Sequence, residues 1–176
     1  MATYNANTTG KEFEKPDNGE FVGVIVDVIN GIVRKSKQPP FQEQLKTRIV
    51  WLLNSKDSEG NYFRVSREVN PKVSAIPGRR KSSYYEVIES VFGSVPAVFD
   101  DESLIGRSNN LFILREKGED GKTYANIKGI TPLKPGQEPM TVPAGFVRSK
   151  DKQQQPLQRS ASVPSAVIPT TETAEF

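Results

Sequence analysis

The chain has 176 residues and a formal net charge of +3, with 24 Lys and Arg residues against 21 Asp and Glu residues. It contains no Cys and no His, which excludes disulfide bonds, thiolate nucleophiles, imidazole bases and zinc sites with nitrogen or sulfur ligands. Residues 1–10 lack the apolar stretch of a secretory signal, and no apolar run reaches the roughly 18 residues of a membrane span, so we expect a cytoplasmic protein without a membrane partner.

Alternating β-branched residues predict the first strand at residues 20–29. Both of its faces are apolar, which is typical of a strand buried on both sides. One face is expected to hold Val22, Val24, Val26 and Val28, and the other Phe21, Ile25 and Ile29. Asn30-Gly31 is typical of a hairpin turn and predicts a turn there. A loop at 35–43 leads to a second strand at 44–53, and a polar hairpin at 55–60 leads to a third at 61–68.

A short helix is predicted at residues 84–92, after a stretch rich in Pro, Gly and cations at 70–81. Apolar residues recur there at helical spacing, Ser83 and Glu86 have the spacing of a capping box, and Gly93 suits the position after the last helical residue. The remaining elements are a turn or single helical turn at 100–104, a fourth strand at 111–117, a hairpin turn at 119–122 and a fifth strand at 123–131.

Three strands, one helix and two further strands are the element order of the five-stranded OB barrel, a Greek-key fold. We therefore expect an all-β protein with one short helix between strands three and four; another small barrel or an α+β sandwich is the alternative. From Pro135 onward Pro, Gln, Ser and Thr dominate and the periodicity is lost, which predicts disorder. The predicted units are a flexible N-terminal segment at 1–18, an OB-like nucleic-acid-binding domain at 19–134 and a disordered tail at 135–176.

Positive charge is concentrated between Arg34 and Lys81, where twelve Lys and Arg residues stand against four Asp and Glu residues, a net charge of +8. The rest of the chain therefore carries −5. A local excess of one sign raises the electrostatic potential, and a positive excess is typical of a surface that binds a polyanion. Aromatic residues are interleaved with these cations, a composition that allows a protein to hold phosphates and stack bases.

The candidate nucleic-acid contacts are predicted on strands two and three and on the loops beside them, because this is the face with which OB barrels bind oligonucleotides. Lys46 and Arg48 lie two residues apart in the second strand and so share a face. A solvated surface loop is the alternative for the three consecutive cations that end at Lys81. The predicted nucleic-acid-binding set is Arg34, Lys35, Lys37, Phe41, Lys46, Arg48, Tyr62, Arg64, Arg67, Lys72, Arg79, Arg80, Lys81, Lys122, Tyr124 and Asn126.

The aromatic residues divide between the core and the predicted interface. Trp51 has the parity of its apolar neighbours in the second strand, so it is assigned to the core. Tyr62 shares a face with Arg64, and we expect it to stack on bases together with Phe41 and Tyr124.

The acidic triplet Asp100-Asp101-Glu102 has the residue types that bind Mg²⁺ or act as acid and base. No second acidic cluster completes a two-metal nuclease site, and a charged turn is the favoured interpretation. No arrangement of a nucleophile with a base is recognisable either. We therefore expect a protein that is not an enzyme and has no cofactor or metal.

Five segments, taken in order, resemble a family of small bacteriophage proteins known as OB-fold single-stranded DNA-binding proteins. These segments are GEFVGVIVDVINGIV, LKTRIVWLL, YFRVSREV, LIGRSNNLFI and GKTYANIKGITPL, and together they span about residues 19–134. The resemblance implies a phage protein that binds single-stranded DNA during replication or recombination in the host cytoplasm. The functional positions of the family correspond in this sequence to Lys46, Arg48, Trp51, Ser66, Arg67, Lys122, Tyr124 and Asn126. The chain departs from the family at 35–43, where members often have a short Gly-containing turn.

The chain ends in Glu175-Phe176 after a Gln-, Pro- and Ser-rich stretch. This end resembles the acidic, Phe-terminated tip with which bacterial single-stranded DNA-binding proteins recruit replication and recombination proteins; a terminus without a function is the alternative. Two other functions stay open: a protein-interaction or structural module of a phage, and RNA binding like that of a cold-shock domain. The sequence leaves a homo-oligomer open as well.

Overall fold

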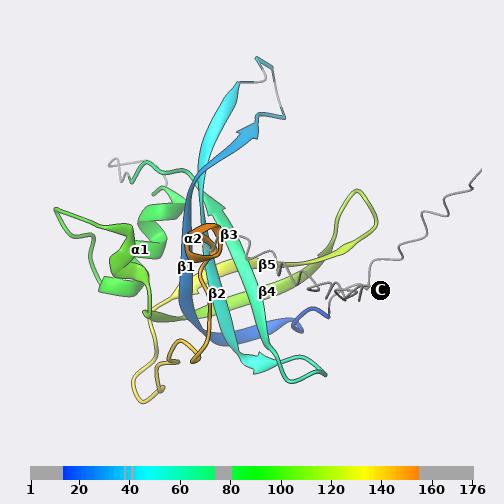
Figure 1. Ribbon diagram of the computed structural model, residues 1–176, viewed down its shortest axis with the longest axis vertical. Helices are drawn as coiled ribbons and strands as arrows, with labels where there is room; N and C mark the ends of the chain where they lie inside the picture. The colour runs from blue at the N-terminus through cyan, green and yellow to red at the C-terminus, as the bar shows by residue number, and fades with distance from the viewer. Residues whose placement is uncertain (1–13, 38, 41, 74–80, 155–176) are drawn as a thin grey trace, which may run out of the picture.

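The core of the protein is a five-stranded antiparallel sheet, seen in a computed structural model that describes residues 14–37, 39–40, 42–73 and 81–154 (Figure 1). The first three strands precede a helix, and two strands follow it, as the sequence predicts. The elements are β1 (Gly19–Lys35), β2 (Glu43–Lys56), β3 (Tyr62–Val69), α1 (Ser83–Phe92), the 3-10 turn η1 (Asp101–Leu104), β4 (Ser108–Lys117), β5 (Thr123–Thr131) and α2 (Ser149–Gln154).

The expected all-β class is confirmed, but a closed barrel is not present. The strands pair in the order β3-β2-β1-β4-β5, and every pair in that order is antiparallel. Within the described residues no ladder joins β3 to β5, so both are edge strands. No helix in this part of the chain is long and apolar enough to cross a membrane.

One face of the sheet, here called the inner face, packs against α1 and η1. Tyr84, Val87 and Ile88 of α1 and Leu104 of η1 are buried there against the inward side chains of the strands. Trp51 is completely buried and donates from Nε1 to Asn109 Oδ1 at 2.9 Å. The assignment of Trp51 to the core is therefore confirmed.

A β-bulge in β1 changes which side chains face the core. The pairing register with β2 shifts between Ile25 and Asp27, and a one-residue slip moves every later side chain to the other face. Consequently Val28 packs into the inner core and Ile29 packs on the opposite, outer face. The predicted burial of both faces of the strand is confirmed, but the strict alternation beyond the bulge is wrong.

A second register shift, between Ile29 and Ile32, replaces the turn predicted at Asn30-Gly31. Gly31 has a φ of 74°, a left-handed conformation that glycine adopts without steric cost. The chain therefore bulges at this point and continues as a strand to Lys35.

Helix α1 begins one residue earlier than predicted. The Oγ of Ser82, not that of Ser83, accepts a hydrogen bond from the backbone N–H of Tyr85, so Ser82 is the N-cap. Gly93 ends the helix with a φ of 76°, as its position in the sequence predicts.

Residues 135–154, here called the strap, do not form the expected disordered tail. Met140, Val142 and Phe146 of the strap pack on the outer face, over a buried cluster made by Val24, Val26, Val50 and Leu52. Three apolar residues suffice to cover this small patch, although the composition around them is polar. The expected boundary at 134/135 is therefore wrong for the strap, and residues 155–176 lie outside the described part.

Polar contacts at the start of α2 hold the strap against β1 and η1. The backbone N–H of Ser149 donates to Asp27 Oδ2 at 2.8 Å, and Asp27 itself is only 1% exposed. Arg148 lies within 3.6 Å of the other Asp27 oxygen and donates to Glu102 at 2.6 Å, and Lys150 lies 3.0 Å from Glu102. Among these contacts, the Arg148 guanidinium compensates the charge of the buried Asp27 carboxylate.

The expected flexible segment at 1–18 is also partly ordered. The backbone N–H of Arg115 donates to Asn18 Oδ1 at 2.6 Å, and the Arg115 side chain donates to the carbonyl oxygens of Pro16, at 2.7 Å, and Lys15. Residues 15–18 therefore lie against β4, and residues 1–13 lie outside the described part.

Candidate nucleic-acid interface

A groove of ≈ 640 Å³ lies between the two edge strands of the sheet. Residues 62–66 of β3 form one wall and residues 124–126 of β5 form the other, while residues 14–16 and Asp57 close one end. The groove exists because no ladder joins β3 to β5 in the described chain, so side chains rather than backbone hydrogen bonds meet across the gap.

Two exposed tyrosines face this groove from opposite strands. On β3, Phe63 and Val65 point into the core, and the alternation turns Tyr62 and Arg64 outward, as the sequence predicts. Tyr62 is 37% exposed, and on β5 Tyr124 is 45% exposed. The groove therefore presents two aromatic rings beside a guanidinium group, the combination that stacks a base and pairs with a phosphate.

Local contacts fix the orientation of both rings. The Tyr124 hydroxyl donates to Asp120 Oδ2 at 2.6 Å, which raises the pKa of the tyrosine and lowers that of the carboxyl. On the other wall the ammonium of Lys56 lies 4.6 Å from the centre of the Tyr62 ring. Rings held in this way lose little conformational entropy when a base stacks on them.

The charge at the groove is mixed. Arg64 has no ion-pair partner within the described residues, whereas Glu14 and Asp57 lie at one end. Glu14 accepts a hydrogen bond from the backbone N–H of Ser58 at 2.9 Å, and this bond lowers the pKa of its carboxyl. The position of Glu14 at the groove could not be predicted from the sequence, because Glu14 is distant from β3 in the chain.

A second cationic patch, here called the arginine patch, lies on the outer face and consists of Arg34, Arg48 and Glu68. Glu68 accepts from Arg34 Nη2 and Nε at 2.6 and 3.0 Å and from Arg48 Nη2 and Nε at 2.6 and 3.2 Å. The hydrogen bonds from Arg34 and then Arg48 lower the pKa of Glu68 to about 2. Two guanidinium groups thus share one carboxylate, and the patch keeps a net charge of +1.

The outward row of β3 connects the groove with the arginine patch. Tyr62, Arg64, Ser66 and Glu68 alternate along that row, and Arg48 is the register partner of Glu68. Beside the patch, Lys46 donates to Asn70 Oδ1 at 2.5 Å. Lys46 and Arg48 therefore share a face, as predicted, but the strap covers the apolar residues that follow them on β2.

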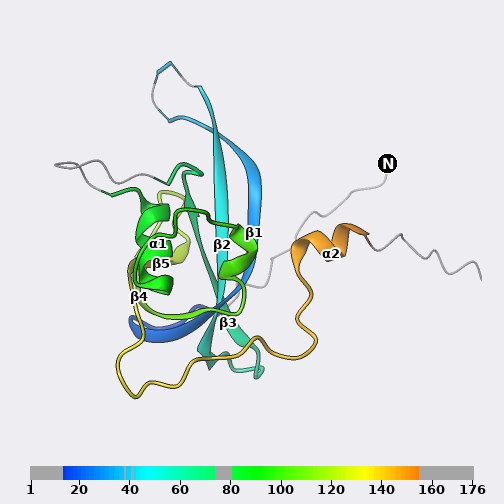
Figure 2. The same cartoon turned by 90° about the vertical axis from the view of Figure 1, so that its left-hand side faces the viewer.

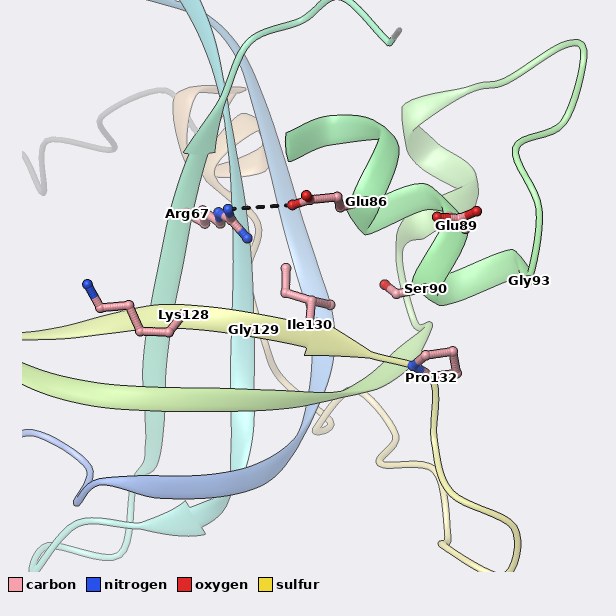
Figure 3. Close-up of a pocket in the computed structure, with 9 residues that line it drawn as sticks. All are labelled: Arg67, Glu86, Glu89, Ser90, Gly93, Lys128, Gly129, Ile130 and Pro132. Carbon is pink, nitrogen blue, oxygen red and sulfur yellow. Dashed lines mark ion pairs between the residues drawn. The ribbon is translucent and has the colours of Figure 1, made fainter. Parts of the chain in front are cut away.

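Two predicted contacts lie on the helix side of the molecule instead. Arg67 points to α1, where it lies 3.8 Å from Glu86 and donates to Ser83 Oγ at 3.5 Å. It lines a separate pocket of ≈ 580 Å³ between α1 and β5 (Figure 3). Lys81 binds Glu89 of α1 at 2.7 Å. The structure therefore does not bring these two cations to the groove.

The remaining predicted contacts are spread around the groove or lie outside the described residues. Lys35 and Lys37 are exposed near the tip of the long β1–β2 hairpin, and Lys72 is exposed after β3. Lys122 lies in the turn before Tyr124, and Asn126 donates to Glu116 Oε2 at 2.5 Å. The predicted residues that lie outside the described part are Phe41, Arg79, Arg80, Glu175 and Phe176.

The acidic triplet is used for structure. Asp100 caps η1, Asp101 accepts from the Tyr84 hydroxyl, and Glu102 binds the strap. No group of three or more potential metal ligands occurs among the described side chains. The interpretation of this segment as a charged turn agrees with these contacts.

The fold and the groove thus define an all-β protein whose open sheet carries aromatic rings and cations between its edge strands. No family model and no curated protein matches the chain. The resemblance to phage single-stranded DNA-binding proteins consequently stays a prediction.

Proposed function

We propose that the protein binds single-stranded DNA with little sequence specificity, in phage DNA replication or recombination. The observation that carries this proposal is the placement of Tyr62 and Arg64 on one wall of the groove and Tyr124 on the other. Every base has a π-face, so stacking on tyrosine tolerates any sequence and contributes about 1–3 kcal/mol per base. Bases in a duplex are already stacked and paired, so the groove suits an unpaired strand.

Phosphates would follow the outward row of β3 from the groove toward the arginine patch. Arg64 lies at the groove, Arg48 lies four residues further along the sheet as the register partner of Glu68, and the Arg34 side chain reaches Glu68 from β1. Lys35 and Lys37 are exposed further out on the β1–β2 hairpin. Because each phosphate contact releases counterions, binding is expected to weaken steeply as salt rises.

We also propose that the sheet is a partly open OB fold. The strand order and the position of α1 between β3 and β4 support this assignment, and an OB barrel carries its oligonucleotide site on strands two and three. The groove between β3 and β5 lies beside that face.

Fluorescence anisotropy of labelled oligo-dT, titrated at low and high salt, tests the proposed function. We expect binding at low salt that weakens with salt, and weaker binding of a duplex of equal length. No binding at low salt would contradict the proposal. Equal binding of duplex would exclude single-strand selectivity, and preferential binding of oligo-dU would favour the RNA alternative.

The mixed charge of the groove favours a second candidate, a protein-interaction module. Glu14 and Asp57 at the groove and Glu68 in the arginine patch reduce the positive potential that a nucleic acid requires. A pull-down that retains a protein partner but no nucleic acid would support this candidate over DNA binding.

A further inference from the structure

The β1–β2 hairpin extends beyond the rest of the sheet as a two-stranded arm, here defined as residues 32–37 and 42–46 (Figures 1 and 2). β3 pairs with β2 only as far as Thr47, and β4 pairs with β1 only from Gly19 to Val24. A two-stranded ribbon is marginally stable in water by itself. Contacts with the rest of the molecule must therefore set its direction, and they include those of Arg34 with Glu68 and of Lys46 with Asn70 as well as contacts at the base of the arm.

A chain of hydrogen bonds, here called the Asn30 clamp, joins the base of the arm to the inner layer. Thr47 Oγ1 of β2 donates to Asn30 Oδ1 at 2.7 Å, and Asn30 Nδ2 donates to Asp101 Oδ2 at 2.6 Å. The hydroxyl of Tyr84 in α1 donates to the other oxygen of Asp101. Thr47 is 1% exposed and Tyr84 is 3% exposed, so the clamp is anchored in the core at both ends.

The amide of Asn30 satisfies both partners of the clamp. The side chain accepts from a hydroxyl through its oxygen and donates to a carboxylate through its nitrogen, and truncation to Ala removes both groups. The bulge at Asn30-Gly31 turns this amide toward η1, while the strand continues into the arm. The clamp therefore holds the point at which β1 changes direction.

The arm carries exposed cations. Lys35 and Lys37 are exposed and have no ion-pair partner within the described residues, in contrast to Arg34, which binds Glu68. We propose that the Asn30 clamp fixes the direction of the arm so that Lys35 and Lys37 hold phosphates of the same single strand whose bases occupy the groove. This role rests on the proposed function, and Asn30, Asp101 and Tyr84 are positioning residues that do not touch the nucleic acid.

The direction of the arm can be measured without nucleic acid. The chain has no Cys, so Gln42→Cys at the arm and Val98→Cys on the helix side give two unique sites for spin labels. We expect a narrow distance distribution in the otherwise unchanged protein and a broad or shifted one after Asn30→Ala or Tyr84→Phe. Asn61→Ala, in the β2–β3 turn, is the matched control and should leave the distribution narrow. An unchanged distribution in both clamp variants would overturn the clamp.

The phosphate contacts are tested by the salt dependence of oligo-dT binding. A single strand loses about 0.7 in the slope of log K against log salt for each phosphate contact removed. Lys35→Ala with Lys37→Ala should thus lower the slope by about 1.4, and Asn30→Ala alone should lower it by a similar amount. Adding Asn30→Ala to the double variant should change nothing further, because both act through the same contacts.

The positioning role would be overturned if Asn30→Ala left the slope of log K against log salt unchanged. It would also be overturned if Asn30→Ala lowered the slope by the same amount in the double lysine variant as in the wild type. If the wild-type protein binds no oligonucleotide, the proposed function and the phosphate contacts of the arm both fail. The label distances then still decide whether the clamp sets the direction of the arm, so the two failures are distinguishable.

Discussion

Arg48 of β2 donates from Nε and Nη2 to a single oxygen of Glu68 on β3, at 3.2 and 2.6 Å. Arg34 donates to both oxygens of the same carboxylate. Within the positively charged stretch of the sequence, the fold thus places Glu68 between Arg34 and Arg48. This acid holds the guanidinium groups in place and competes with any phosphate that approaches them.

Replacing the acid by its neutral isostere should strengthen nucleic-acid binding. Glu68→Gln leaves an acceptor for the arginines but raises the net charge of the arginine patch by one. We expect oligo-dT to bind roughly 3- to 10-fold more tightly at low salt, with a steeper salt dependence, because an uncompensated guanidinium attracts phosphate more strongly. Anisotropy titrations over a salt series measure both quantities.

Glu89→Gln is the matched control for this change. It also removes one negative charge from an ion pair, that with Lys81, but on the helix side of the molecule. Its effect on binding should be small at physiological salt, where exposed charges further apart than about 8 Å are screened. If both variants strengthened oligo-dT binding equally, the net charge of the protein alone would account for the effect, and the location of Glu68 would not.

Trp51 provides an internal test of which aromatic residues stack. It is the only tryptophan, is completely buried and binds Asn109, so bases cannot reach its ring. Saturation with oligo-dT should leave the wavelength and intensity of tryptophan emission nearly unchanged. Strong quenching by the oligonucleotide would contradict the structure of the core or require that binding opens it.

The strap should contribute to the stability of the domain. Phe146→Ala removes a partly buried ring from the outer face, and we expect the free energy of unfolding to fall by about 1–2 kcal/mol, less than for a fully buried phenylalanine. Urea unfolding followed by circular dichroism measures the change. Val147→Ala is the control, since Val147 is 42% exposed and should cost little.

Acid should weaken the attachment of the strap. Hydrogen bonds from Arg148 and then Lys150 lower the pKa of Glu102 from 4.5 to about 2. A depressed carboxyl pKa stabilises the folded state above pH 4.5, and this contribution is lost as the pH falls from 4.5 toward 2. Because Glu102 is half exposed, solvent screening keeps the effect small.

The wild-type protein should therefore exceed Glu102→Gln in stability by a constant amount above about pH 5. The difference should close as the pH falls through the range between the two pKa values. Urea midpoints of both proteins across this pH range measure the difference. A gap that persists at pH 2 would show that the ion pairs with Arg148 and Lys150 are not its cause.

The order of the elements could be predicted from the sequence because hydrophobic periodicity is a local property. The bounds of β5 match the predicted fifth strand, and the core position of Trp51 follows from parity alone. The bulges of β1 could not be predicted, since Asn30-Gly31 suits a hairpin turn and a bulge equally well and only pairing with β2 decides between them.

The candidate site was harder to predict because its residues meet through register and long-range packing. The neutralisation of Arg48 by Glu68 depends on which residues face each other across two strands, and Glu14 reaches the groove from a distant part of the chain. The packing of the strap could not be predicted for another reason. Its composition is polar, and its apolar contacts with the sheet are made by Met140, Val142 and Phe146.

The central claim is that Tyr62 and Tyr124 stack on unpaired bases in the groove. Its most direct test is the affinity of oligo-dT for Tyr62→Ala, Tyr124→Ala and the double variant, with Tyr85→Ala on α1 as the tyrosine control. Each groove variant should bind about 5- to 150-fold more weakly, the equivalent of about 1–3 kcal/mol per base, while Tyr85→Ala should bind like the wild type. Wild-type affinity in the double variant would contradict the account.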